Sequence, residues 1–409
     1  MEFLKVDTLA GARDKLLASM KGWLPSTETV TLDEAHGRIL SKDILAPQDI
    51  PAFKRSSVDG YALFASDTSA AGESIPVFLA IKGRVEIGIP AAFSIQRGEC
   101  AEVPTGGMLP GGANAVAMVE YTEPFGAEGL ALYASVADGE NVVQIGEDAR
   151  AGGMLLRSGR RVRPQDIGVL AAAGITTVPV YTPPCLTILS TGDELLPPEH
   201  KPSLGQVRDI NTPALTALAR KSGFIVVNSA VLPDDESMLK TTIQAAMQTS
   251  DIIAVSGGSS KGPRDMTRAA FDRVASPGVF THGIAIKPGK PTILALDVPS
   301  RTVLIGLPGH PVSAMVIFEL LLGWLFRELT GCAPEPAIPA RIACNAASAP
   351  GKLTCWPVAL EWTGSEYVAH PVFGKSGLIT TLSAADGYCL AERDREGLQA
   401  GEWVSVHLF

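Results

Sequence analysis

The chain has 409 residues, 46% of them hydrophobic, and a mean hydropathy of +0.20, so we expect a well-buried protein of roughly two to four domains. Its formal net charge of −9 and its pI near 5.3 exclude a general nucleic-acid binder, which would carry a basic face. The six cysteines form no CxxC pair, and the apolar stretch 315–326 is short and contains Glu319. We therefore expect a cytoplasmic protein with reduced thiols, no signal peptide and no membrane span.

The first half of the chain predicts one β-rich domain between helical segments. The patterns first indicate a helix over 6–21, with Asp7 or Thr8 as its cap, and then a strand and a short helix over 29–45. Short strands between Gly and Pro turns follow over 77–143. A helix over 163–173 comes next, and Gly174 ends it.

The second half predicts an α/β domain followed by a β domain. Strands over 186–189, 224–231, 252–255 and 303–305 alternate with helices over 213–222, 235–247 and 311–329. This alternation indicates parallel βαβ units and an open, doubly wound sheet. After the proline-rich linker 332–340, strand-like runs at 356–362, 367–371, 387–391 and 403–408 predict a small β-barrel or sandwich.

Three glycine-rich loops lie within the α/β segment, at 256–265, 287–291 and 306–313. Ligands of such sheets bind at the carboxyl ends of the strands, where we expect all three loops. Glycine lets backbone N–H groups approach an anion closely, and the stiff Lys-Pro-Gly-Lys-Pro turn suits a small dianion, unless Lys287 and Lys290 are only surface lysines. The first loop is not a Walker A motif. The loops together predict a site for a phosphate-bearing or oxyanion ligand.

Acidic residues follow two of the predicted strands. Thr191-Gly-Asp-Glu-Leu195 places two carboxylates at the ligand edge, or a cap and a solvated glutamate. Asp235 suits a helix cap, which leaves Asp234 for a metal or ligand, and Asp265 suits either role. The upstream polar turns at 55–62, 105–107 and 146–150 are, from their residues alone, structural turns.

In their order and spacing these segments resemble the molybdopterin molybdenumtransferase family, which shares its fold with the enzymatic part of gephyrin. The resemblance covers the whole chain and rests on Ser57–Ala62, Gly146–Asp148, Ser190–Leu195, Pro233–Asp235, Ser256–Gly258, Lys287–Pro291 and Leu307–Gly309. It implies an α/β multidomain fold with an open, mostly parallel sheet. The implied divisions are an N-terminal helix (1–25) packed on the α/β domain, a linking domain (26–45 and 146–182), a β-rich inserted domain (46–145), the α/β domain (183–331) and a C-terminal β-barrel domain (340–409).

The resemblance also implies an L-shaped homodimer whose active site is shared between subunits, and transfer of molybdate into adenylylated molybdopterin with Mg²⁺-dependent release of AMP. Acidic positions that serve activity match Asp59, Asp148, Glu194, Asp234 and Asp265, of which Asp234 and Asp265 are expected to serve Mg²⁺. Positions expected to contact the pterin nucleotide or the oxyanion match Thr105, Gly257, Gly258, Ser260, Lys287, Lys290, Pro291, Pro308, Ser313 and Ser376. Other cofactor-biosynthesis proteins and acceptor enzymes are the further partners that it implies.

The sequence departs from the family pattern at a few places. Position 261 is Lys where an apolar residue is usual, position 310 is His where Asn is usual, and the stretch 351–357 lacks the usual arginines, for which Lys261 or Lys352 would substitute. Two alternatives stay open: a molybdopterin adenylyltransferase, whose fold would match only the α/β domain, and a non-catalytic scaffold that binds pterin or clusters proteins.

Overall fold

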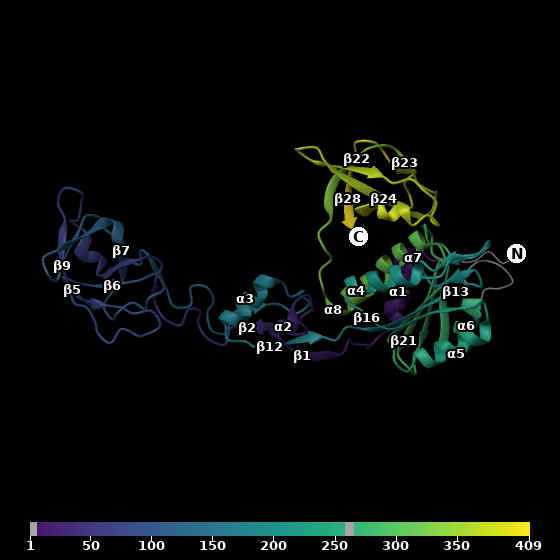
Figure 1. The fold of residues 1–409 in the computed structure, drawn as a ribbon, viewed down its shortest axis with the longest axis horizontal. Helices are drawn as coiled ribbons and strands as arrows, with labels where there is room; N and C mark the ends of the chain where they lie inside the picture. The colour runs from purple at the N-terminus through teal and green to yellow at the C-terminus, as the bar shows by residue number, and fades with distance from the viewer. Residues whose placement is uncertain (1–5, 258–265) are drawn as a thin grey trace.

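The computed structural model describes residues 6–257 and 266–409. The molecule is elongated: a β-rich domain lies at one end, a small linking domain follows, and the α/β domain lies at the other end with the C-terminal barrel beside it (Figure 1). Two chain segments connect the linking domain to the α/β domain, one on the way out and one on the way back.

A six-stranded sheet forms the centre of the α/β domain, in the order β16-β13-β17-β21-β20-β18. Its four parallel strands are β13 (Cys185–Thr191), β16 (Ile225–Leu232), β17 (Ile252–Ser256) and β21 (Thr302–Leu307). The last two positions are occupied by β20 (Ile293–Asp297), which pairs antiparallel with β21, and β18 (Pro277–His282), which pairs antiparallel with β20. The predicted, mostly parallel sheet is therefore confirmed.

Helices cover both faces of this sheet, which explains why β17 and β21 are buried along their whole lengths. The helices are α1 (Leu9–Ser19), α4 (Asn211–Lys221), α5 (Glu236–Ala246), α6 (Met266–Val274), α7 (Pro311–Phe318) and α8 (Trp324–Thr330). Alternate residues of β17 point to opposite faces, with Ile252 and Ala254 on one core and Ile253 and Val255 on the other. The first core contains α1, α4, α7 and α8, and the second contains α5 and α6.

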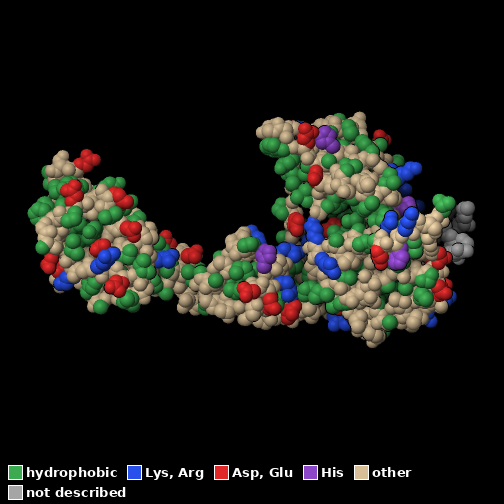
Figure 2. Space-filling view, in the orientation of Figure 1, with side chains coloured by type: hydrophobic (Ala, Val, Ile, Leu, Met, Phe, Trp, Pro, Cys, Tyr) green, Lys and Arg blue, Asp and Glu red, His purple; other side chains and the backbone are tan. Residues whose placement is uncertain are grey.

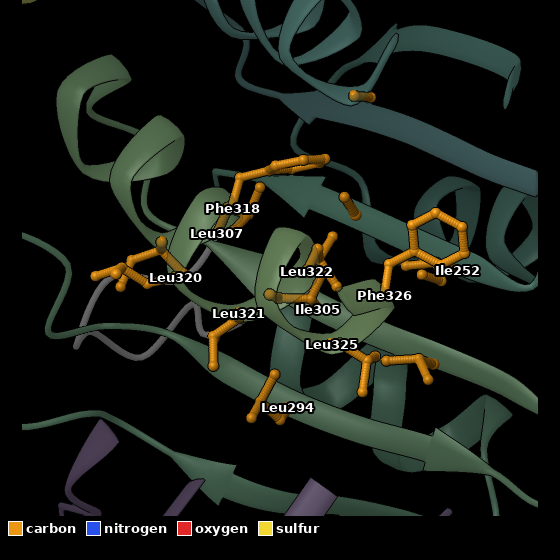
Figure 3. Close-up of a cluster of buried hydrophobic side chains, with 14 of the residues drawn as sticks. Ile252, Leu294, Ile305, Leu307, Phe318, Leu320, Leu321, Leu322, Leu325 and Phe326 are labelled. Carbon is orange, nitrogen blue, oxygen red and sulfur yellow. The ribbon is translucent and has the colours of Figure 1, made fainter. Parts of the chain in front are cut away.

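The helix predicted over 311–329 is present but contains a π-helical turn, η3 (Glu319–Gly323), between α7 and α8. Its apolar side chains, including Phe318, Leu322 and Leu325, lie against Ile305 and Leu294 of the sheet (Figure 3). At the other end of the chain, Thr8 caps α1 by accepting a hydrogen bond from the Gly11 N–H at 3.0 Å, as predicted. This packing makes the ends of the strands a rigid support.

The turn 287–291 follows a strand that the sequence analysis did not predict. β18 pairs antiparallel with β20, which pairs antiparallel with β21, so β18 runs in the same direction as the four parallel strands and the turn lies beyond its carboxyl end, as expected. The turn reaches the ligand edge, because Ile293 at the start of β20 pairs with Gly306 near the end of β21.

The linking domain and the β-rich domain form an arm. The linking domain contains β1 (Thr27–Thr31), α2 (Leu32–Ala35), β2 (Ile44–Leu45), β11 (Met154–Leu156), α3 (Pro164–Ala172) and β12 (Thr177–Tyr181). The β-rich domain contains β3 (Arg55–Ser56), β4 (Gly60–Leu63), η1 (Ala65–Thr68), β5 (Val77–Arg84), β6 (Glu99–Val103), β7 (Ala115–Met118), η2 (Val119–Tyr121), β8 (Thr122–Phe125), β9 (Gly129–Leu132) and β10 (Val142–Val143).

The C-terminal region is a closed five-stranded barrel, which settles the choice between barrel and sandwich. Its strands are β22 (Ile338–Ile342), β24 (Leu353–Trp362), β25 (Tyr367–Pro371), β26 (Gly387–Ala391) and β28 (Trp403–Leu408), and β24 pairs with β26 to close the ring. Short elements complete the chain: β14 (Leu195–Leu196), β15 (Val207–Arg208), β19 (Ile286–Lys287), β23 (Ala346–Ala347), α9 (Thr380–Ser383) and β27 (Gly397–Leu398). Among the described residues, no helix has the length and apolar character needed to cross a bilayer.

Candidate functional site

The parallel strands β13, β17 and β21 end next to one another around Gly257. A Cβ atom on Gly257 would lie 2.4 Å from the carbonyl oxygen of Thr191 at the end of β13, and a Cβ on Gly309, after β21, would lie 3.7 Å from the Gly257 Cα. Gly257 also has φ of +106°, and its carbonyl accepts a hydrogen bond from Thr267 Oγ1 at 3.0 Å. Only glycine fits this position, so its backbone is held where the three strand ends meet.

A polar side chain that the sequence analysis did not single out connects these loops. Asn211, the first residue of α4, donates from Nδ2 to Ser256 Oγ at 2.7 Å and to the Gly309 carbonyl at 2.8 Å. The carbonyl acceptor settles the orientation of the amide. Asp209, which is 4% exposed, accepts the N–H of Asn211 at 3.0 Å and thereby supports the start of α4. The available signal was the Asp-x-Asn pattern at a helix start, which alone indicates only a cap.

The acidic residues after β13 and β16 lie in adjacent loops. Asp193 Oδ1 accepts the backbone N–H of Asp234 at 3.0 Å, so Asp193 bridges two strand ends and does not cap a helix. Glu194 is exposed and lies over Gly192, where a Cβ would be 2.7 Å from Glu194 Oε2. Asp234 is exposed at the same edge. These carboxylates therefore lie at the ligand edge, as predicted.

Asp235 is the helix cap that the sequence indicated. Its Oδ1 accepts hydrogen bonds from Ser237 Oγ at 2.7 Å and from the Met238 N–H at 2.8 Å. The hydroxyl of Ser237, followed by the Met238 N–H, lowers the pKa of the Asp235 carboxyl because both hydrogen bonds favour the charged form. Asp235 is thus occupied by its own helix.

The lysine-bearing turn packs against α7. A Cβ on Gly289, which has φ of +119°, would lie 2.5 Å from Ile317 Cδ1, so glycine lets the turn approach the helix. Lys287 and Lys290 are exposed on either side, with no ion pair to any other described residue. Lys352 immediately precedes Leu353, whose N–H donates to the Ala285 carbonyl at 3.0 Å, so this stretch lies beside the lysine turn.

The barrel contributes a loop at the start of α7. The N–H of Val312 donates to the Ser376 carbonyl at 3.2 Å, and His310 Nδ1 lies 2.8 Å from Ser376 Oγ. Pro311 occupies the first helical turn, as predicted, and Ser313 lies in the same turn with 3% exposure. Ser376, Pro308 and Ser313 are therefore gathered around one helix end, beside the Lys287–Pro291 turn.

Asp59 and Thr105 are brought together, but in the arm. Asp59 Oδ1 accepts the Thr105 N–H at 2.7 Å and its hydroxyl at 3.0 Å, and these bonds, the backbone one first, lower the pKa of Asp59. Asp148 is exposed where the β-rich domain joins the linking domain, and its N–H donates to the Ile50 carbonyl at 3.0 Å. The β-rich domain lies at the opposite end of the molecule from the α/β domain (Figure 1). Within one subunit the two sets of residues do not meet.

Several predicted residues lie outside the described part of the chain: Gly258, Ser260, Lys261 and Asp265. Within the described part, no group of three or more His, Cys, Asp or Glu side chains is arranged to hold a metal ion. The described site thus consists of glycine-rich strand ends, exposed lysines and single carboxylates.

Comparison with known proteins identifies this arrangement. Family models match 8–174 ("MoeA N-terminal region (domain I and II)"), 187–327 ("Probable molybdopterin binding domain") and 339–409 ("MoeA C-terminal region (domain IV)"). The molybdopterin molybdenumtransferase of Haemophilus influenzae is 31% identical, with 98% of each chain covered, and that of Bacillus subtilis is 29% identical over 93% of this chain and 90% of its own. The molybdopterin biosynthesis moeA protein of Pyrococcus horikoshii OT3 has a similar structure, with a TM-score of 0.86, 31% identity, and 99% and 100% of the two chains covered. The chain belongs to the molybdopterin molybdenumtransferase family.

Proposed function

We propose that this protein is a transferase of molybdenum cofactor biosynthesis that inserts molybdate into adenylylated molybdopterin and releases AMP. The observation that carries the proposal is the meeting of three strand ends at Gly257, together with a turn whose two exposed lysines form no ion pair with another described residue. Such an edge offers backbone donors to a nucleotide and positive charge to an oxyanion. The names of the full-length relatives support the same activity.

The oxyanion would lie between the lysine turn and the start of α7. Molybdate is a tetrahedral dianion, and Lys287, Lys290 and the Ser376 hydroxyl are exposed or half-exposed donors around that point. Charge-assisted hydrogen bonds from such groups hold a dianion in reach of the pterin dithiolene. The contribution of the protein is then mainly positioning and electrostatic stabilisation.

The carboxylates fit a magnesium ion that a nucleotide brings with it. Glu194 and Asp234 are exposed on neighbouring strand ends, and Asp265 follows the glycine loop in the sequence. Mg²⁺ commonly takes one or two carboxylates plus substrate phosphates and waters, so a cage of protein ligands is not required. Asp234 and Asp265 would hold the ion, which would neutralise charge on the pyrophosphate when bound.

A second subunit would complete the site. Asp59, Thr105 and Asp148 lie on the arm, away from the α/β edge of their own chain, so we propose a homodimer in which the arm of one subunit covers the edge of the other. Six unpaired cysteines are compatible with a reducing compartment, and we propose that the enzyme acts in the cytoplasm.

The test is a turnover assay on the purified protein. With adenylylated molybdopterin, Mg²⁺ and either molybdate or tungstate, we expect AMP release and metal in the pterin product, with the preferred oxyanion giving the faster reaction. Formation of adenylylated molybdopterin from ATP and molybdopterin would indicate the adenylyltransferase alternative. Binding of the pterin nucleotide without AMP release, with molybdate and with tungstate, would support the scaffold alternative.

A further inference from the structure

The barrel and the α/β domain meet at His310. This residue is the N-cap of α7, yet its side chain makes no cap hydrogen bond. Its Nδ1 instead lies 2.8 Å from Ser376 Oγ, and a Cβ on Gly377 would lie 3.8 Å from its Cδ2. The imidazole therefore lies against the 376–377 loop of the barrel.

The same loop is also fixed through its backbone. The Ser376 carbonyl accepts the N–H of Val312, the second residue of α7, at 3.2 Å. Two contacts thus hold one serine, one through its backbone and one through its side chain. Ser376 is only half-buried, so its side chain remains partly accessible to solvent.

The direction of the hydrogen bond between the two side chains decides what Ser376 can offer. A serine hydroxyl has one proton, while an imidazole nitrogen either donates or accepts according to its tautomer. If Nδ1 accepts, the serine proton points at the ring and the oxygen lone pairs face outward. If Nδ1 donates, the serine proton is available to an anion.

We propose that His310 is a positioning residue that donates from Nδ1 to Ser376 Oγ and thereby turns the Ser376 proton toward the bound oxyanion. The proposal rests on the proposed function of the site. It makes the barrel part of the oxyanion site, because the serine comes from the barrel and the histidine from the start of α7.

The experiment measures molybdate and pterin-nucleotide dependence in His310→Ala, Ser376→Ala, the double variant and His310→Asn. We expect about a tenfold higher KM for molybdate in both single Ala variants, with the KM for the pterin nucleotide and kcat nearly unchanged. The double variant should be no worse than Ser376→Ala, because both changes remove one interaction. His310→Asn retains a side-chain donor and should recover most of the molybdate affinity.

His370→Ala is the matched control, because His370 is an exposed barrel histidine paired with Glu361 and lies in another part of the domain. It should leave both KM values unchanged. Additive effects in the double variant, equal losses for both substrates, or a His310→Asn variant as weak as His310→Ala would overturn the proposal. Wild-type protein without turnover would overturn the proposed function itself, whereas an active wild type with unaffected variants would overturn only the role of His310.

Discussion

The α/β edge and the Asp59 turn differ in how each is built. At the α/β edge, residues far apart in sequence converge: Gly257 contacts Thr191 and Gly309, and Asn211 holds two of the three loops. In the arm, Asp59 accepts hydrogen bonds from one residue, Thr105, and remains exposed. The first region is a rigid receptor, and the second presents a single carboxylate.

The two regions also differ in charge. Residues 46–145 contain twelve Asp and Glu but five Lys and Arg, and the acidic side chains are spread over the surface of this domain (Figure 2). The lysine turn, by contrast, presents Lys287 and Lys290 without a described ion-pair partner. A dianion would be repelled by the arm and attracted to the turn. Under the proposed function, the homodimer would bring the anion-binding groups and the Asp59 carboxylate together.

The largest effect is expected for Asp59→Ala. Because Asp59 is exposed and outside every core cluster, the variant should fold normally, yet AMP release should fall by about 100-fold or more, as for loss of a general acid–base group. Rates of AMP release and thermal unfolding measure the two effects. The control is Asp138→Ala, an exposed carboxylate of the same domain, which should keep wild-type turnover.

Mixed dimers test whether the two regions come from different subunits. Asp59→Ala and Lys290→Ala proteins, each nearly inactive at low molybdate, are dissociated, mixed and reassociated. About one quarter of the wild-type rate should return, since half of the dimers are mixed and each has one intact site. A rate that stays at the mean of the two parents would place both residues in the same subunit's site.

The next largest effects on activity are expected for Lys287→Ala and Lys290→Ala. Each removes a charge-assisted hydrogen bond of about 1.5–3 kcal/mol, so the KM for molybdate should rise roughly 10- to 100-fold while that for the pterin nucleotide changes little. Lys201→Ala, at an exposed loop lysine, is the control. Equal losses for the two substrates would assign the lysines to the phosphates.

Substitutions at the neighbouring residues Asp234 and Asp235 distinguish metal binding from helix capping. Asp234→Asn should lower AMP release by more than about tenfold, with partial rescue at raised Mg²⁺, because an amide is a weaker magnesium ligand. Asp235→Asn should stay near wild type, since Asn caps helices as well as Asp does. Activity and Mg²⁺ titrations of the two variants give the answer, and near-normal turnover of Asp234→Asn with an unchanged Mg²⁺ requirement would remove the metal assignment.

The smallest effect is expected in the titration of Asp59. Its folded pKa is depressed, so the stability contributed by its hydrogen bonds is present above the unfolded pKa and is lost as pH falls through the folded pKa. Thr105→Ala removes the hydroxyl bond and keeps the backbone one, so the pKa should rise part of the way toward its usual value. NMR titration of the Asp59 carboxyl carbon checks this, and an unchanged pKa would show that the backbone N–H alone sets it.

Local patterns predicted much of the fold. Helical spacing located α1 and α3, the alternation of strands and helices gave the parallel sheet, and Asp235 was correctly read as a cap. The strands β18 and β20 were not predicted, because their antiparallel pairing depends on partners elsewhere in the sheet.

By itself, the sequence determined the kinds of groups in the site and their order: glycine turns, paired lysines and carboxylates after apolar strands. Only the tertiary structure decided which of them meet. The contacts of Asn211 with Gly309 and of His310 with Ser376 join residues 98 and 66 positions apart, and no local propensity encodes such separations. Helices packed on both faces of the α/β sheet hold its strand ends together. The part of the proposed site that lies on the α/β domain therefore exists only in the folded chain.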